Sequence, residues 1–147
     1  MAITVQEMLK MSQQQLDDLF SSVPAGPIPK GEAEGTAINA PGTAFSHQIA
    51  KFINIFAWQG KIFDPDHGVL KNRITLLGFH AIIAKVYKGS SWMDNKECIV
   101  LDYSETSLIA HWIRDEIREV APNVYLGKVY LGKKRLIDFA LEFPAAP

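Results

Sequence analysis

The feature that most constrains the fold is a succession of short runs of β-branched and aromatic residues, which begins at Trp58 and continues almost to the end of the chain. Turn-forming residues separate the runs, and runs of this length and composition are typical of β-strands. Strands joined by so few residues pair antiparallel, because a parallel connection needs a much longer crossover. We therefore expect strands over 58–63, 69–77, 79–88, 96–103, 123–131 and 134–143.

Two of the connections carry their own turn signals. Asp94-Asn95 suits the two positive-φ positions of a tight hairpin, and Gly132 suits the turn between the last two strands. A further short run over 34–39 adds another candidate strand near the N-terminus.

The segment 106–120 has two interpretations. Its apolar residues recur at helical spacing, which favours a helix. An antiparallel sheet, however, needs enough strands to close on itself or to cover its edges, and this segment can supply one long strand. With the strand interpretation the total reaches about eight, the number at which a small barrel encloses a side-chain core or one small ligand.

The first part of the chain reads as a helical arm. Thr4 to Glu7 and Ser12 to Gln15 both have the form of a capping box, and Leu16, Leu19 and Phe20 fall on one face of the second helix. The Pro- and Gly-rich stretch that follows cannot form regular structure. We expect a single domain over 1–147, with the arm and linker at 1–31, a barrel at 32–143 that includes a helix over 43–56, and a frayed tail at 144–147.

Composition excludes several classes of protein. Lys and Arg number 15 against 16 Asp and Glu, a net charge of −1, so no basic face predicts a nucleic-acid partner. The single cysteine, Cys98, excludes a disulfide framework and suits a reducing, cytoplasmic location, where we expect it to be an inert packed thiol. The N-terminus lacks the apolar core of a signal peptide, and no window approaches the roughly 18 apolar residues of a spanning helix, so no membrane partner is expected.

Several residues match a known family. Leu19-Phe20, Pro24, Gly31 and Gly35, a helix, and then Trp58-Gln59-Gly60-Lys61-Ile62-Phe63-Asp64 resemble the lipocalin-like GXWXG family, although Glu32-Ala33-Glu34-Gly35 has no Trp where the family has one. Asp115 to Val120 followed by Val124-Tyr125-Leu126-Gly127 is similar to the closing pattern of that family. The resemblance implies a calycin-type antiparallel β-barrel, mainly β with N-terminal helices, and no assigned activity. It is also the reason why we favour a strand over 106–120.

Two residues are candidates for proton transfer. Asp102 ends a strongly apolar run, where an unpaired carboxylate is desolvated and gains the raised pKa of a general acid or base; alternatively it caps the following turn. His111 is the candidate base, with Asp102 or Asp115 as its carboxylate neighbour. The four histidines lack metal-ligand spacing, and no nucleotide-binding motif occurs, so we expect neither a metal nor a cofactor.

A second set of residues is a candidate for ligand binding. On a strand, Arg114 and Arg118 share one face with Glu116; facing a barrel interior they anchor an oxyanion, and facing outward they form a solvated ion-pair ladder. Trp58, Tyr103 and Tyr125 are candidate apolar walls and His80 a lining residue, although the same aromatic residues also suit a dry core.

Three functions follow from this sequence. The first is a barrel that binds a small lipophilic molecule with a polar or anionic end. The second is a cofactor-independent isomerase, cyclase or lyase that uses His111 or Asp102. The third is an interaction protein that forms a homodimer through its amphipathic N-terminal arm. Whether the interior is hollow discriminates among them, and the sequence does not say which face of each strand lies inside, because a one-residue slip exchanges the two faces.

Overall fold

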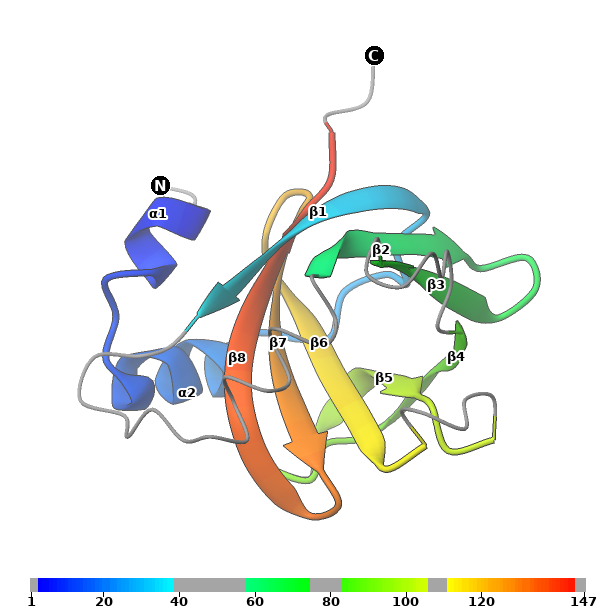
Figure 1. Ribbon diagram of the computed structural model, residues 1–147. Coiled ribbons are helices and arrows are strands. Elements are labelled where there is room, and N and C mark those ends of the chain that lie inside the picture. Colours follow the sequence, from blue (N-terminus) through cyan, green and yellow to red (C-terminus); the bar gives the residue numbers. More distant parts are fainter. Residues whose placement is uncertain (1–2, 39–57, 75–82, 106–110, 145–147) are drawn as a thin grey trace.

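A computed structural model describes residues 3–38, 58–74, 83–105 and 111–144, without the side chains of 58–60 and 71–74. In these ranges two short helices precede eight strands (Figure 1). The helices are α1 (Val5–Met8) and α2 (Gln13–Ser22). The strands are β1 (Gly31–Ile38), β2 (Trp58–Asp64), β3 (Val69–Ile74), β4 (Ile83–Ser90), β5 (Glu97–Asp102), β6 (Ile113–Ala121), β7 (Val124–Leu131) and β8 (Lys134–Glu142).

The strands form a closed antiparallel barrel in which each strand pairs with the next along the chain. β8 returns to pair with β1, where Glu34 lies opposite Glu142 and Ile38 lies opposite Asp138. Within the described residues, the pairing of β3 with β4 joins Val69–Lys71 to Ile83–Lys85. The expected fold, a mainly β antiparallel barrel of about eight strands, is confirmed.

Most of the described part of the segment 106–120 is a strand, β6, which begins at Ile113 in spite of the helical spacing. Most of its residues are buried on both faces, because one face lines the barrel and the other lies beneath the N-terminal arm. A strand covered on both sides shows no polar alternation, which is why its pattern resembled a helix. β1 also begins at Gly31, earlier than expected. The expected helix over 43–56 and the positions 39, 75–77, 79–82 and 106–110 lie outside the described residues.

One of the two turn predictions is confirmed and the other is wrong in part. Gly132 has a φ of 62° in the β7–β8 turn, as expected. In the β4–β5 connection only Asn95 has a positive φ, also 62°. The turn is longer than a two-residue hairpin, as the hydrogen bond from the Ser91 N–H to the Lys96 carbonyl shows. Asp94 instead accepts hydrogen bonds from the Lys96 N–H and from Arg118.

The helical arm packs on the outside of the barrel, next to β1 and β8 in Figure 1, and its buried side chains join an apolar cluster with residues of β5, β6 and β7. The Ser12 capping box is present with both of its hydrogen bonds, and Leu16 and Phe20 are fully buried. They join an outer apolar cluster with Met8, Ile38, Cys98, Val100, Ala121, Val124, Leu126 and Ala140. The apolar face of the arm is therefore covered by its own barrel, and a homodimer built on that face would first have to detach it.

Ion pairs fix the same arm to the barrel. Asp17 of α2 accepts hydrogen bonds from Lys128 Nζ at 2.7 Å and from both terminal nitrogens of Arg135 at 2.8 and 2.9 Å. Lys128 is fully buried and also donates to Asp138 at 2.7 Å. Burial raises the pKa of Asp17, but the hydrogen bonds from Arg135, Lys128 and Gln13 outweigh it and hold this pKa below its usual value.

We predict that Asp17→Asn lowers the free energy of unfolding by about 1 kcal/mol, a value already reduced for solvent screening. A lowered folded-state pKa means that the contribution is fully present above the ordinary value of 3.8 and is lost progressively as the pH falls from 3.8 to the folded-state pKa, so that pH 3 removes part of it. Urea titrations at pH 7 and pH 3 test this, with Asp18→Asn, an exposed carboxylate of the same helix, as the control. A stability difference between wild type and Asp17→Asn that is the same at both pH values would contradict the prediction.

Candidate functional site

Three polar side chains meet inside the otherwise apolar barrel. Lys61 Nζ donates a hydrogen bond to the Tyr103 hydroxyl at 2.8 Å and lies 3.2 Å from Asp115 Oδ2. The Tyr103 hydroxyl in turn donates to the same carboxylate oxygen at 3.4 Å. All three residues are at most 3% exposed. We call Lys61, Tyr103 and Asp115 the interior cluster.

Strand alternation directs these side chains inward. In β2, Lys61 is two residues from Phe63, and in β6, Asp115 lies between Ile113 and Ile117. These three apolar neighbours all belong to the barrel core, so the charged residues between them share the inner face. Tyr103 follows β5 directly and is part of the same core.

Burial opposes the charged form of both ionisable partners. Desolvation lowers the pKa of Lys61, although the adjacent Asp115 carboxylate acts in the opposite direction. Desolvation likewise raises the pKa of Asp115, against the effects of Lys61 and Tyr103. The proton between these two groups is therefore held less firmly than in a solvent-exposed ion pair.

One oxygen of the interior cluster lacks a partner. Asp115 Oδ1 is buried and accepts no hydrogen bond within the described part of the chain, while Oδ2 receives both Lys61 and Tyr103. An unsatisfied buried acceptor costs about 1–3 kcal/mol, and more when it is charged. Buried polar atoms without a hydrogen-bond partner are rare in native proteins, so this oxygen requires an explanation.

Aromatic rings surround the amine of Lys61. Its nitrogen lies 5.5 Å from the ring centroids of both Tyr103 and Phe139. The Phe139 ring occupies the space above Gly127, where an added Cβ would lie 2.2 Å from the ring. Phe63 and Phe143 add a further aromatic contact, with centroids 5.7 Å apart. The interior cluster is therefore a small polar site among apolar and aromatic side chains.

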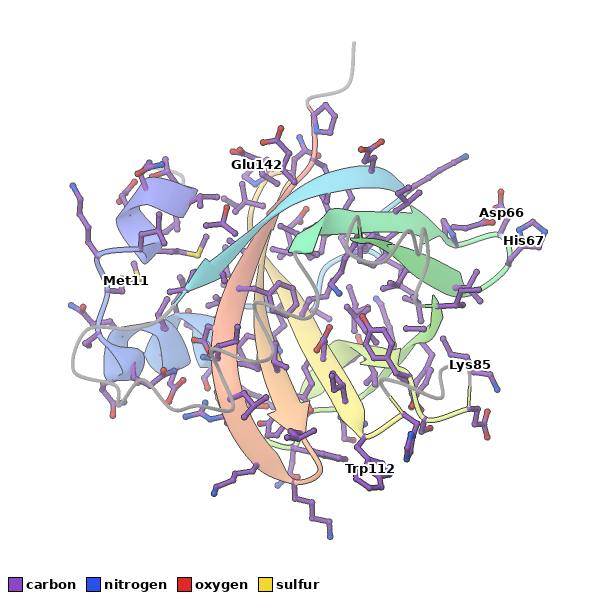
Figure 2. All side chains as sticks on the ribbon, viewed as in Figure 1. Met11, Asp66, His67, Lys85, Trp112 and Glu142 are labelled. Atoms are coloured by element: carbon purple, nitrogen blue, oxygen red, sulfur yellow. The ribbon has the colours of Figure 1, made fainter. Side chains whose placement is uncertain are left out.

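Two surface grooves lie at opposite ends of the barrel, which Glu142 and Trp112 mark in Figure 2. The groove at the Glu142 end has a volume of 660 Å³, and two of its residues, Ala33 and Phe143, also belong to the barrel core. The groove at the Trp112 end has a volume of 360 Å³.

The structure places the two predicted arginine anchors on the outer face of β6, which corrects the inward alternative. Arg118 is fully buried under the arm, where it binds Asp94 at 2.6 and 2.7 Å and donates to the Phe20 carbonyl at 2.9 Å. Arg114 binds Glu116 at 3.0 Å and lies over the Trp92 ring. The other alternative, a solvated ion-pair ladder of Arg114, Glu116 and Arg118, is also wrong. Glu116 and Arg118 are buried, and they hold the arm and the β4–β5 turn in place.

Asp102 and His111, the candidates for proton transfer, both line the groove at the Trp112 end. Asp102 is paired, because it accepts hydrogen bonds from the Tyr87 hydroxyl at 2.8 Å and from the backbone N–H and hydroxyl of Ser104. Burial raises the pKa of Asp102, but these hydrogen bonds outweigh it and leave the pKa lowered. The raised pKa that general acid catalysis requires is therefore absent at Asp102, which caps the turn after β5.

The other candidates divide between the interior and the undescribed parts of the chain. Tyr103 and Tyr125 both lie in the barrel core, and the Tyr125 hydroxyl donates to the Pro27 carbonyl at 2.7 Å. Trp58 opens β2, but its side chain lies outside the described residues, as does all of His80. Cys98 is buried in the outer cluster, where desolvation raises the pKa of its thiol to about 12, in keeping with an inert thiol.

Sequence reasoning missed the pairing of Lys61 with Asp115. Lys61 appeared only within a family motif, and Asp115 only within the closing pattern of that family and as a carboxylate neighbour of His111. The available signal was a charged residue two positions from large apolar residues within a strand.

Among the described residues, no group of three or more His, Cys, Asp or Glu side chains is arranged to hold a metal ion. In the same ranges, neither helix has the length and apolar character needed to cross a bilayer.

Comparison with known proteins supports the fold alone. A scan of protein-family models gave no match, and neither did a search of curated proteins. A crystal structure of a protein from Thermomonospora curvata is similar, with a TM-score of 0.64 and 15% sequence identity over 92% of this chain and 90% of that one. The barrel therefore occurs in a second protein, while the resemblance to the GXWXG family stays a prediction.

A substitution at Gly127 tests how closely the Phe139 ring packs beside the interior cluster. We predict that Gly127→Ala lowers the free energy of unfolding by about 1–3 kcal/mol, because the new methyl group displaces the Phe139 ring. Gly89→Ala is the control, since its Cβ would lie 3.2 Å from Val100 Cγ2 and 3.5 Å from the Tyr87 ring, contacts that are much less close than the 2.2 Å at Gly127. Urea denaturation measures both, and equal costs for the two variants would contradict the close packing of Phe139 on Gly127.

Proposed function

We propose that this barrel binds a small lipophilic molecule with an uncharged polar end, and that Lys61, Tyr103 and Asp115 hold that end inside the barrel. The observation that carries the proposal is the unpartnered Asp115 Oδ1 beside a buried lysine. A hydroxyl group of a ligand can donate to this oxygen, and a carbonyl group can accept from Lys61 or Tyr103. Either one reduces the cost of burying the cluster.

The charges of the interior cluster favour an uncharged end over an anionic one. Lys61 already faces one carboxylate at 3.2 Å, so an anion placed beside it would also face Asp115. Two carboxylates that share a buried site repel each other. The arginines that would have favoured an anion are engaged on the outer face.

The rest of the interior suits the hydrocarbon part of such a ligand. Described side chains of the core are almost all aliphatic or aromatic, and binding sites for small molecules commonly combine such walls with a few polar groups. Eight strands is the size at which a barrel accommodates one small ligand. The free thiol of Cys98 agrees with a reducing, cytoplasmic location, which we include in the proposal.

The enzyme alternative has one supporting observation, the shared groove of Asp102 and His111. The hydrogen bonds to Asp102 and its lowered pKa argue against this carboxylate as a general acid. We therefore base the proposed function on the interior cluster and not on the groove that Asp102 and His111 line.

We predict that 1-octanol binds with one molecule per chain and more tightly than octanoate of the same length. Lys61→Met combined with Asp115→Leu removes the cluster, and we expect octanol affinity to fall by about 10- to 100-fold, the equivalent of one hydrogen bond to a charged acceptor. This variant should still fold, because replacing a buried ion pair by apolar side chains is often neutral or stabilising. Isothermal titration calorimetry measures the affinity and urea denaturation the stability.

The matched control is Lys128→Met combined with Asp138→Leu, which removes the buried Lys–Asp pair on the outside of the barrel. This control should leave octanol affinity unchanged. Native mass spectrometry of untagged protein taken from cells, compared with its denatured mass, shows whether a ligand is already held. Failure of wild-type protein to bind octanol, or equal losses in the two double variants, would overturn the proposal.

A further inference from the structure

The nitrogen of Lys61 has the surroundings of a reactive amine rather than those of a structural ammonium. Among the described side chains, a phenol hydroxyl lies at 2.8 Å, a carboxylate at 3.2 Å, and the centroids of two aromatic rings at 5.5 Å. Lys128, the other fully buried lysine among the described residues whose side chains are placed, donates instead to both Asp17 and Asp138 at 2.7 Å each. The carboxylate contact of Lys61 is therefore longer than the two carboxylate contacts of Lys128.

We propose that Lys61 captures an aldehyde or ketone as an imine inside the barrel. This inference rests on the proposed function and deepens it, because it names a carbonyl compound as the ligand. Amines of lysine form such imines with carbonyl compounds once they have lost their proton, and buried lysines lose it most readily. Desolvation lowers the pKa of Lys61, which agrees with the geometry.

Asp115 can take the proton that Lys61 must lose. The transfer along the 3.2 Å contact leaves a neutral amine and a neutral carboxylic acid. The amine nitrogen then attacks the carbonyl carbon; the N–C bond forms while the C=O π bond breaks, and the nitrogen proton passes to the oxygen, which gives a neutral carbinolamine. The hydroxyl of this carbinolamine is a donor of the kind that Asp115 Oδ1 lacks.

Loss of water completes the step. Asp115 returns its proton to the carbinolamine hydroxyl, the C–O bond breaks, water leaves, and the nitrogen lone pair forms the C=N bond. The products are a protonated imine, a carboxylate and one water molecule, so the charge of the site equals that of the initial ion pair. Asp115 then pairs with the imine N–H, and the rings of Tyr103 and Phe139 face the cation.

Reductive trapping with octanal and sodium borohydride tests the inference on the full chain. The reagent reduces the imine to a stable octyl amine, and peptide mapping by mass spectrometry locates it. We expect one octyl group per chain at Lys61 when octanal is limiting. Its rate of formation should exceed that at the exposed Lys10 by about tenfold or more, a difference of ~1.4 kcal/mol in barrier, and Lys128 should stay unmodified.

Two further variants separate a chemical role of the cluster from a structural one. Asp115→Asn and Tyr103→Phe keep the shape of the side chain, and in both we expect slower trapping at Lys61 while urea denaturation shows that the variant is still folded. An octyl group on Lys10 but none on Lys61, in a protein that binds octanol, would overturn the imine while leaving the proposed function standing. Failure to bind octanol would overturn the proposed function itself.

Discussion

The pairing of β8 with β1 is the constraint on which the rest of the structure depends. It turns a meander of antiparallel strands into a closed barrel and removes both free edges of the sheet. Closure also decides which face of every strand lies inside, because side chains alternate along each strand. Lys61, Tyr103 and Asp115 meet only because three separate strands or strand ends direct them to one interior.

Closure divides the buried charges into two groups with different roles. On the outside, Arg118 with Asp94 and Lys128 with Asp138 lie beneath the helical arm and have several hydrogen bonds each. These charges are well satisfied, and they hold the arm in place. In the interior, one oxygen of Asp115 is left without a partner among the described residues. This difference is why we assign a ligand to the interior pair and structural roles to the outer pairs.

The strands were predictable from sequence because turn residues separate short β-branched runs, and the Ser12 cap was predictable because its partner is local. The faces were not predictable, since a one-residue slip in register exchanges them. Arg114 and Arg118 were therefore considered for the interior, although β6 directs them outward. The role of Asp94 was missed for a related reason: Arg118, the partner that holds it, is 24 residues away.

Ligand binding in the barrel depends most directly on the group that contacts Asp115 Oδ1. A crystal structure of the protein with 1-octanol bound would show this contact. We predict that the octanol hydroxyl lies within hydrogen-bond distance of Oδ1, about 2.7 Å, with its alkyl chain among the core side chains. Octanol bound only in the groove at the Glu142 end or the groove at the Trp112 end, with Oδ1 still without a partner, would contradict the account.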